Sequence, residues 1–449
     1  MDTVEIFSRL LGLVYFAAFF PFLFQIRALI GENGILPLQK YLDFIALRLP
    51  KEKYYYFPTL FWFNASNKAL MSVAFLGTFL SIILMAGYFT PLALIGLYVL
   101  YLSIVWAGQI FLGYGWEGFL LEITIHAFLL NLTPIPDTFV WISIYFLLFR
   151  FHVQAGAVKL QSKDPYWRNL TATYIHYESQ PLPNPVAWYM QKLPMWFHKA
   201  SCLYMFFVEM VVPFAIFFGP EVRLVAFGFL VSLQLIIAFS GNFSFLNLMT
   251  IVLCTVLLGV QPTEVTWVAP FGILLLTLQA IRFANHFFPR STFERILQPF
   301  QHFFLVNRYG LFAVMTVKRY EIIPEGSDDM ETWKPYGFRF KPDNVTERPP
   351  IIAPFQPRLD WQMWFLPFAL FDPNSWFQSF LSALLEGNKE VLKLVRINPF
   401  PDKPPKYIRA RAYLYEYTSW DEGKLSKAWY KRKDAGLFTP TLTLKNPKS

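Results

Sequence analysis

Ionisable side chains stand inside long apolar runs of this chain, and they are the first residues that could carry chemistry. Glu122 and His126 are four residues apart in one such run, so they share a helical face and can share a hydrogen bond. An ionisable side chain in lipid is costly, and it is therefore a functional candidate by default. Two interpretations stay open for Glu122, a chemical role and a structural contact between helices, whereas the structural one is favoured for His126.

A second set of such residues ends the next apolar run. His152, Gly156 and Lys159 lie on one helical face, and the glycine lets another backbone or a ligand approach closely. A lysine at the edge of an apolar site loses solvation, which favours the neutral amine that can act as a general base. The alternative for Lys159 is a side chain that extends its charge to the membrane interface.

The segment 161–199 is polar, rich in proline and too long for a simple turn. His176 and Glu178, with Arg168, Asn184 and His198, supply imidazole, carboxylate, guanidinium and amide groups on a stiffened backbone, which suits a preorganised site. The segment could equally be a rigid plug whose polar groups bond one another. The spacing of its histidines and carboxylate matches no standard metal signature, so we expect no bound metal.

Three more polar residues stand at the ends or breaks of apolar runs. Glu117 opens the run that holds Glu122. Glu209 precedes Pro213 by four residues, and the proline removes a helical donor and bends the helix, which predicts an acid at a bend facing the bundle interior. Asn242 lies in a polar break at 240–247, where we expect it to cap the following helix, although it could also reach inward.

The elements that must position these residues are membrane helices. Of the 449 residues, 55% are hydrophobic and 15% charged, whereas soluble domains carry about 25% charged residues. A spanning helix needs about 20 mostly apolar residues. The apolar runs are 10–24, 69–87, 91–107, 119–132, 139–151, 200–218, 222–239, 245–260 and 265–281. The sequence therefore predicts a polytopic α-helical membrane protein with about nine spans, the first of them retained as a signal-anchor.

The net charge of +9 does not indicate a nucleic-acid partner, because membrane proteins collect Lys and Arg at their interfaces. Cys202 and Cys254 both stand in apolar runs, so we expect neither a disulfide framework nor a thiol mechanism. No nucleotide-binding or hydrolase motif occurs in a context that would give it meaning, and no cofactor is expected.

Composition divides the chain into two parts. Residues 1–282 form the predicted transmembrane bundle, with the proline-rich segment 161–199 inside it, and residues 283–449 alternate aromatic, charged and proline residues. Segments 319–323, 337–341 and 407–417 alternate as strands do, whereas 375–385 and 389–395 are typical of helices. We expect a small C-terminal domain, mixed α/β or mostly β, that is associated with the membrane through the apolar stretch 361–371.

Long, order-preserving motifs resemble the lipase maturation factor family. They are residues 115–117, 167–170, 176–185, 196–198, 240–247, 336–338, 341–342, 357–365 and 398–400. The resemblance implies an endoplasmic-reticulum membrane protein that helps dimeric lipases reach their active form, with a luminal C-terminal domain linked to client binding. It adds Arg358, Asp360 and Trp361 to the candidate binding residues. The chain is shorter and poorer in cysteine than vertebrate members, which suits a bacterial or simplified relative, in the inner membrane if bacterial.

A more distant similarity concerns the segment around Lys159. An Ala-Gly pair, the pair Lys159–Leu160 and the following Trp167 resemble the membrane domain of vitamin K-dependent γ-glutamyl carboxylase. In that family the corresponding lysine acts as the base toward the quinol, and this resemblance implies the same role for Lys159.

Two hypotheses follow. In the first, the chain is a membrane-embedded maturation factor that binds client proteins, lipase-like by resemblance, and performs no reaction. In the second, it is a membrane enzyme with Lys159 as general base and His152, Glu122, His176 and Glu178 near a lipid-soluble or quinone-like substrate. Convergence of these side chains on one pocket open to lipid would favour chemistry, and separate packing would favour a scaffold.

Overall fold

The computed structural model describes residues 2–368, 372 and 375–444. Its N-terminal helices begin at polar caps and end where the backbone can turn. The Asp2 and Ser66 side chains accept hydrogen bonds from free backbone amides in the first turns of α1 and α5. α5 ends at Gly87, whose φ of 82° a glycine adopts without steric cost. The first helices are α1 (Thr3–Phe19), α2 (Phe22–Ile30), α3 (Leu38–Arg48), α4 (Lys53–Tyr56), α5 (Asn67–Ala86), α6 (Thr90–Ala107) and α7 (Gly115–Leu130), with the 3-10 turns η1 (Leu60–Trp62) and η2 (Gln109–Leu112).

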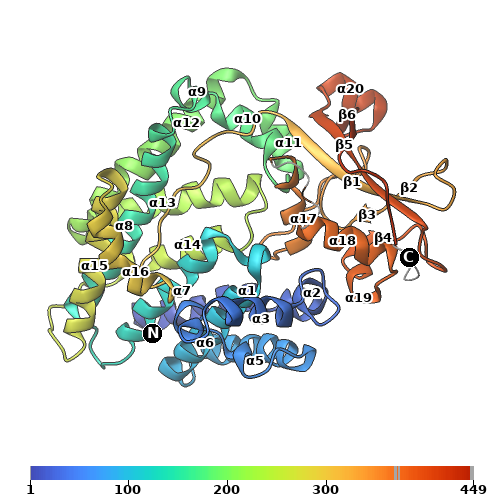
Figure 1. The fold of residues 1–449 in the computed structure, drawn as a ribbon. Helices are drawn as coiled ribbons and strands as arrows, with labels where there is room; N and C mark the ends of the chain where they lie inside the picture. The colour runs from blue at the N-terminus through green and yellow to red at the C-terminus, as the bar shows by residue number, and fades with distance from the viewer. Residues whose placement is uncertain (1, 369–371, 373–374, 445–449) are drawn as a thin grey trace.

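The middle of the chain is also helical, including the segment 161–199, which folds into short helices rather than an open loop. The elements are α8 (Thr138–Gln161), α9 (Pro165–Arg168), α10 (Ala172–Ser179), α11 (Pro185–Gln191), α12 (Met195–Met210), η3 (Val212–Phe217), α13 (Pro220–Ser240), α14 (Leu246–Cys254), η4 (Thr255–Leu258), α15 (Ala269–Phe287) and α16 (Ser291–Gln301). Cys202 and Cys254 are buried free thiols. α1 packs on α5, α8 on α12 and α15, and α13 on α14 (Figure 1).

Five helices among the described residues are long and apolar enough to cross a membrane. They are α5, α6, α8, α13 and the stretch Met195–Phe217 formed by α12 and η3; α1 and α2, bent by 43°, would make a sixth if they are one span. The count of about nine is not confirmed. α7 has only 16 residues, Leu246–Leu258 is shorter still, and α15 falls below the hydropathy of a span because its second half carries Gln279, Arg282 and Asn285.

The C-terminal part is a small region that contains strands, as the sequence predicts. The strands are β1 (Arg319–Ser327), β2 (Lys334–Pro335), β3 (Gly337–Phe338), β4 (Val395–Ile397), β5 (Tyr407–Tyr417), β6 (Tyr430–Leu437) and β7 (Leu442–Thr443). They form an antiparallel sheet in the order β2-β1-β5-β6, with β7 paired to β5, and a separate β3-β4 pair. The central register places Arg319 opposite Tyr415.

The C-terminal helices differ in part from those expected. They are α17 (Arg358–Met363), η5 (Leu366–Phe368), α18 (Trp376–Leu385), α19 (Lys389–Leu392) and α20 (Trp420–Ser426). The helix expected at 389–395 ends early, because β4 begins at Val395 and pairs with β3. The apolar stretch expected to dock this domain is partly α17 and η5, and its last residues, 369–371, lie outside the described part of the chain.

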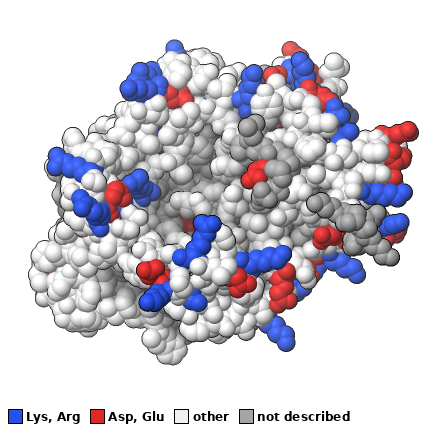
Figure 2. Space-filling model, viewed as in Figure 1, with Lys and Arg blue, Asp and Glu red and all other residues white. Residues whose placement is uncertain are grey.

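The C-terminal part packs onto the helical bundle, and one continuous hydrophobic core runs through both. In Figure 1 the strands lie on the opposite side of the molecule from α8, α12 and α15, with α17 and α18 between the strands and the rest. Charged side chains are also distributed unevenly. On the face drawn in Figure 2 they gather over the strands, whereas the region where α8 and α15 begin is almost free of them.

Candidate functional site

The last turns of α8 carry a lysine that reaches a neighbouring helix rather than solvent. Lys159 Nζ lies 2.8 and 2.7 Å from the two Glu209 carboxylate oxygens and also donates to the Ala155 carbonyl at 3.1 Å. The two residues are 5% and 7% exposed. The ammonium group also lies 5.6 Å from the centre of the Trp167 ring. Each charge therefore has its partner inside the protein, as a buried ion pair requires.

Glu209 meets Lys159 because α8 and α12 approach closely at this point. A Cβ at Gly156 would lie 2.6 Å from Met210 Cγ and 3.1 Å from Glu209 Cβ, so only glycine fits without a shift. α12 ends at Met210, and Pro213 follows within η3, where its missing amide hydrogen prevents an unbroken α-helix. The carboxylate consequently sits at a break between helical segments and faces inward.

His152 stands two turns before Lys159 on the same face of α8, and both line one cavity. His152 Nδ1 lies 3.0 Å from the Leu148 carbonyl, so this nitrogen carries the proton and donates it. Its Nε2 is buried without a hydrogen-bond partner in the described part of the structure.

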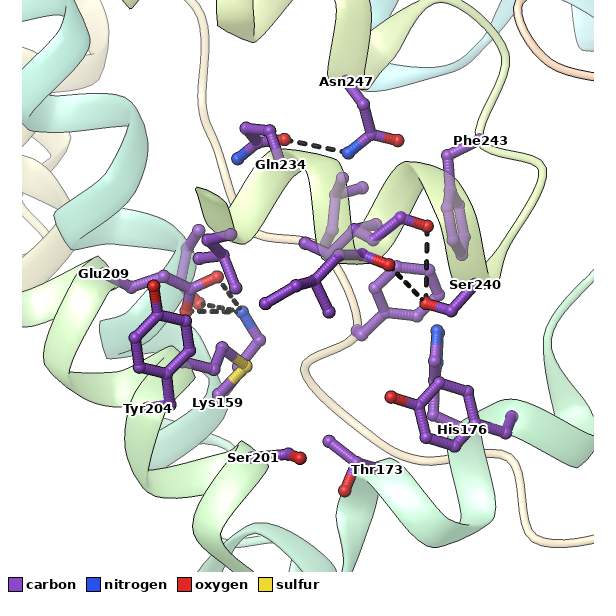
Figure 3. Close-up of a pocket in the computed structure, with 18 of the residues that line it drawn as sticks. Lys159, Thr173, His176, Ser201, Tyr204, Glu209, Gln234, Ser240, Phe243 and Asn247 are labelled. Carbon is purple, nitrogen blue, oxygen red and sulfur yellow. Dashed lines mark hydrogen bonds and ion pairs between the residues drawn. The ribbon is translucent and has the colours of Figure 1, made fainter. Parts of the chain in front are cut away.

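His176, on α10, lines the same cavity from the other side. Its ring stacks on Phe243 with a centroid distance of 5.7 Å and meets Phe312 edge-on at 4.8 Å. Burial, and secondarily the Lys159 charge, lowers the pKa of His176 to about 4, so the imidazole is neutral near pH 7. Figure 3 shows Lys159 and Glu209 on one side of this space and His176 and Ser240 on another.

The cavity has a volume of about 520 Å³, within the range of small-molecule sites. Its wall is mostly apolar and comes chiefly from α8, α10, α12, α13 and α14. Its other polar groups include Gln234 and Asn247, whose side chains are joined by a 2.8 Å hydrogen bond. Ile236, on the outer face of α13, also lines it and is 44% exposed, so the cavity is open toward the apolar surface of the bundle.

Glu122 does not belong to this cavity. Its carboxylate pairs with Arg150 and accepts hydrogen bonds from Tyr309 Oη at 2.6 Å and from the Asn307 backbone amide at 2.8 Å. The expected side-chain contact with His126 is absent, because His126 Nδ1 instead contacts the Glu122 backbone carbonyl. Glu122 therefore fastens the segment after α16 to α7 and α8.

Glu178 and Glu117 join the bundle to the C-terminal part. Glu178 accepts the Tyr417 amide at 2.9 Å, and burial raises the pKa of its carboxyl. Glu117 pairs with Arg358 of α17 and accepts from Tyr101, and all three side chains are buried. Neither carboxylate lines the cavity, so these two residues and Glu122 do not join Lys159 in one site.

Asn184, His198 and Asn242 bond mainly to backbone groups. Asn184 caps α11 by accepting the Ala187 amide at 3.0 Å, and His198 lies 3.2 Å from the Leu193 carbonyl. Asn242 does not cap a helix as expected. Its Nδ2 donates to the Leu182 and Pro350 carbonyls and its Oδ1 accepts the Ile352 amide at 2.8 Å, so the side chain is occupied by the C-terminal part.

The residues that the resemblance adds are buried around α17. Asp360 Oδ1 accepts the Phe340 and Lys341 amides at 2.8 and 3.0 Å, and burial raises the pKa of Asp360 to about 6. Trp361 meets the Trp116 ring edge-on at 5.2 Å. Arg168, by contrast, is exposed at the end of α9. Arg358, Asp360 and Trp361 hold the domain in place and are not on the surface.

Sequence reasoning missed several residues of the Lys159 cavity and of the Glu122 cluster. Arg150 is a charge inside an apolar run, and the same rule that singled out Glu122 would have found it. Gln234 and Asn247 are isolated amides in apolar runs and gave a weaker signal of the same kind. Phe312 gave none, because it reaches the cavity from a segment far along the chain. The described residues contain no group of three or more His, Cys, Asp or Glu side chains placed to hold a metal ion.

Comparison with known proteins agrees with the motifs. The lipase maturation factor transmembrane domain matches residues 3–264, and the lipase maturation factor C-terminal domain matches residues 305–440. Mouse lipase maturation factor 1 is 31% identical across 98% of this chain and 87% of its own length. Bovine lipase maturation factor 1 is 32% identical across 97% and 88%, and lipase maturation factor 2 of Xenopus tropicalis is 31% identical across 97% and 81%.

No solved structure matches the chain. Both family domains occur in order, and relatives above 30% identity cover nearly the whole sequence. The resemblance drawn from the motifs is confirmed, and this membrane protein belongs to the lipase maturation factor family.

Proposed function

We propose that this protein is a membrane-embedded maturation factor for secreted proteins with lipase-type clients, and that it performs no reaction. The observation that carries the proposal is the match of both family domains together with relatives named lipase maturation factors over almost the whole chain. The proposal places the protein in the endoplasmic-reticulum membrane of a eukaryotic cell, or in the inner membrane of a bacterium. It keeps the division into a bundle at 1–282 and a client-binding domain at 283–449.

The contacts between the two parts support a rigid scaffold. Glu117 with Arg358, Glu178 with the Tyr417 amide, and Asn242 with the backbone at 350–353 all bridge the bundle and the C-terminal part. Buried polar contacts of this kind favour one arrangement of the two parts, because breaking them leaves a buried charge or polar group without its partner. A domain held in this way can offer a client a preformed surface beside the membrane, which lowers the ordering cost of binding.

The test is secretion of active lipase from cells that lack their own lipase maturation factor. The full-length chain is expressed with a secreted dimeric lipase, and activity is measured per mass of secreted lipase. We expect this specific activity to rise, while a secreted monomeric enzyme in the same cells is unchanged. An unchanged lipase in cells whose membranes contain the protein would refute the lipase client class, and a rise in both enzymes would indicate a general effect on secretion.

A second candidate function is favoured by one observation, the convergence of Lys159, His152 and His176 on one cavity open to the apolar surface. It is a membrane enzyme acting on a lipid-soluble or quinone-like substrate, with Lys159 as general base. Three contacts weigh against it. Lys159 is paired with Glu209 and must lose its proton before it can accept one, and Glu122 and Glu178 are engaged elsewhere.

Lys159→Arg separates the two candidates in the same secretion assay. Arginine keeps a cation opposite Glu209 but stays protonated in proteins, so it cannot act as a base. The maturation proposal predicts that lipase specific activity stays close to wild type. Complete loss of that activity in a variant that still elutes as a folded protein would favour the enzyme.

A further inference from the structure

The cavity between α8, α10, α12 and α13 has unused hydrogen-bonding capacity. Neither ring nitrogen of His176 has a hydrogen-bond partner among the described residues, although the ring is held in place by Phe243 and Phe312. Nor does Gln234 Nε2 have a partner there, since the hydrogen bond with Asn247 uses the Gln234 carbonyl oxygen. His152 lines the same cavity, and its Nε2 is buried without a partner among the described residues. A buried polar group without a partner is costly, so these groups together point to a ligand that satisfies them.

The charges of the cavity restrict the head group of such a ligand. Of the described residues that line it, Lys159 and Glu209 are the charged ones, and each neutralises the other. The low pKa of His176 leaves that ring neutral at physiological pH, with one donor and one acceptor nitrogen. Among the described residues that line the cavity, no free cation or anion therefore remains for a charged head group, whereas a hydroxyl can both donate to and accept from the imidazole.

The opening of the cavity restricts the rest of the ligand. Ile236 of α13 and Ala200 of α12 line the cavity and are exposed on helices whose outer faces are long and apolar. A molecule that enters between these helices therefore comes from the bilayer. The volume of about 520 Å³ accepts a head group and the first part of one chain, and the remaining chain would leave between α12 and α13.

We propose that this cavity binds one neutral membrane lipid, with a hydroxyl-bearing head beside His176 and Gln234 and an apolar tail that leaves between α12 and α13. The ligand is a bound component, and its binding requires neither a lipase client nor a reaction. The inference is therefore independent of the maturation role.

Photolabelling of the full-length protein in phosphatidylcholine vesicles at pH 7.4 tests this site. One probe is a long-chain alcohol with a diazirine in its tail, and the matched probe is an alkyl sulfonate with the same tail. We expect the alcohol to label peptides of α12 and α13 that line the cavity, and excess oleyl alcohol to compete. The sulfonate should label them at least about tenfold less, because an unpaired charge in an apolar site is strongly disfavoured.

Two variants locate the head group and the opening. His176→Phe keeps the ring between Phe243 and Phe312 but removes both nitrogens, and it should reduce labelling by the alcohol about fivefold, as the loss of one hydrogen bond does. Ala200→Trp places a large side chain at the exposed opening and should abolish labelling inside. Leu224→Trp is the matched control, since Leu224 is exposed on α13 but does not line the cavity.

Three results would overturn the proposal. The first is equal labelling of the same peptides by the sulfonate, which would mean that the head group is not selected. The second is labelling by the alcohol that neither oleyl alcohol nor Ala200→Trp reduces, which would mean adventitious contact with bulk lipid. The third is unchanged labelling in His176→Phe when Ala200→Trp abolishes it, which would show a site without the assigned head-group contact.

Discussion

The buried pair of Glu117 and Arg358 joins α7 to α17, and Arg358→Met tests how firmly the C-terminal part is held. Arg358 is completely buried and Glu117 is 1% exposed. Methionine keeps much of the side-chain volume over Phe22 but leaves the Glu117 carboxylate without its cation and the Phe111 carbonyl without a donor. Removing one partner of a buried ion pair costs about 3–5 kcal/mol.

This loss of free energy destabilises the contact between α17 and α7, so α17 should separate from the bundle more often. At 1.4 kcal/mol for each factor of ten, the equilibrium between docked and open forms shifts by about 10² to 10³·⁵. Hydrogen exchange of amides reports such local opening directly. We expect the peptide covering 357–365 to lose protection by that factor in the purified protein, while peptides of α5 keep theirs.

The double variant Glu117→Gln with Arg358→Met is the control. It removes both charges, and Tyr101 can still donate to the glutamine oxygen, so much of the lost protection should return. The reasoning fails if Arg358→Met changes protection of 357–365 less than threefold, or if the double variant is no better protected than the single one.

Three further predictions concern single positions. Gly156→Val should destabilise the protein by about 1–3 kcal/mol, seen as a lower thermal midpoint, because the added atoms collide with α12; Gly228→Val, where a Cβ meets nothing within 4 Å, is the matched control. Because burial raises the pKa of Asp360 from its ordinary value to about 6, folding stability should fall by about 3 kcal/mol as pH rises from about 4 to 6, and denaturant melts of Asp360→Asn should lack this loss. Glu209→Gln alone should lower the thermal midpoint more than Glu209→Gln combined with Lys159→Met, because the single change leaves an ammonium ion uncompensated inside the protein.

The class of the protein could be predicted from the sequence because a helix that crosses lipid must be long and mostly apolar. Long apolar runs give helices, and the residues that interrupt them are rare enough to be noticed one by one. Helical periodicity placed His152, Gly156 and Lys159 on one face, and in the structure that face meets the cavity and α12. The number of spans was harder, because length and apolarity do not distinguish a spanning helix from a short helix buried among others, as α14 is.

The partners of the charged residues could not be predicted in the same way. The distance from Glu122 to Arg150 is 28 residues, and to Tyr309 it is 187 residues. Spacing within one helix shows which side chains share a face, but it does not show what another helix places opposite them. For this reason residue type alone places Glu122 with Lys159 in one candidate site, although the fold gives each its own counter-ion.

α8 explains why two separate polar systems coexist in one bundle. Arg150 and Lys159 are nine residues apart, which at 3.6 residues per turn is about two and a half turns, so they point to opposite sides of the helix. Arg150 pairs with Glu122 where the segment toward the C-terminal domain is fastened, whereas Lys159 pairs with Glu209 at the cavity. Changes on the first side should therefore loosen the domain and leave lipid labelling intact, and His176→Phe should do the reverse. If maturation of a lipase is lost only with the first kind of change, the scaffold carries the function; if it is lost with both, the bound lipid is part of the scaffold.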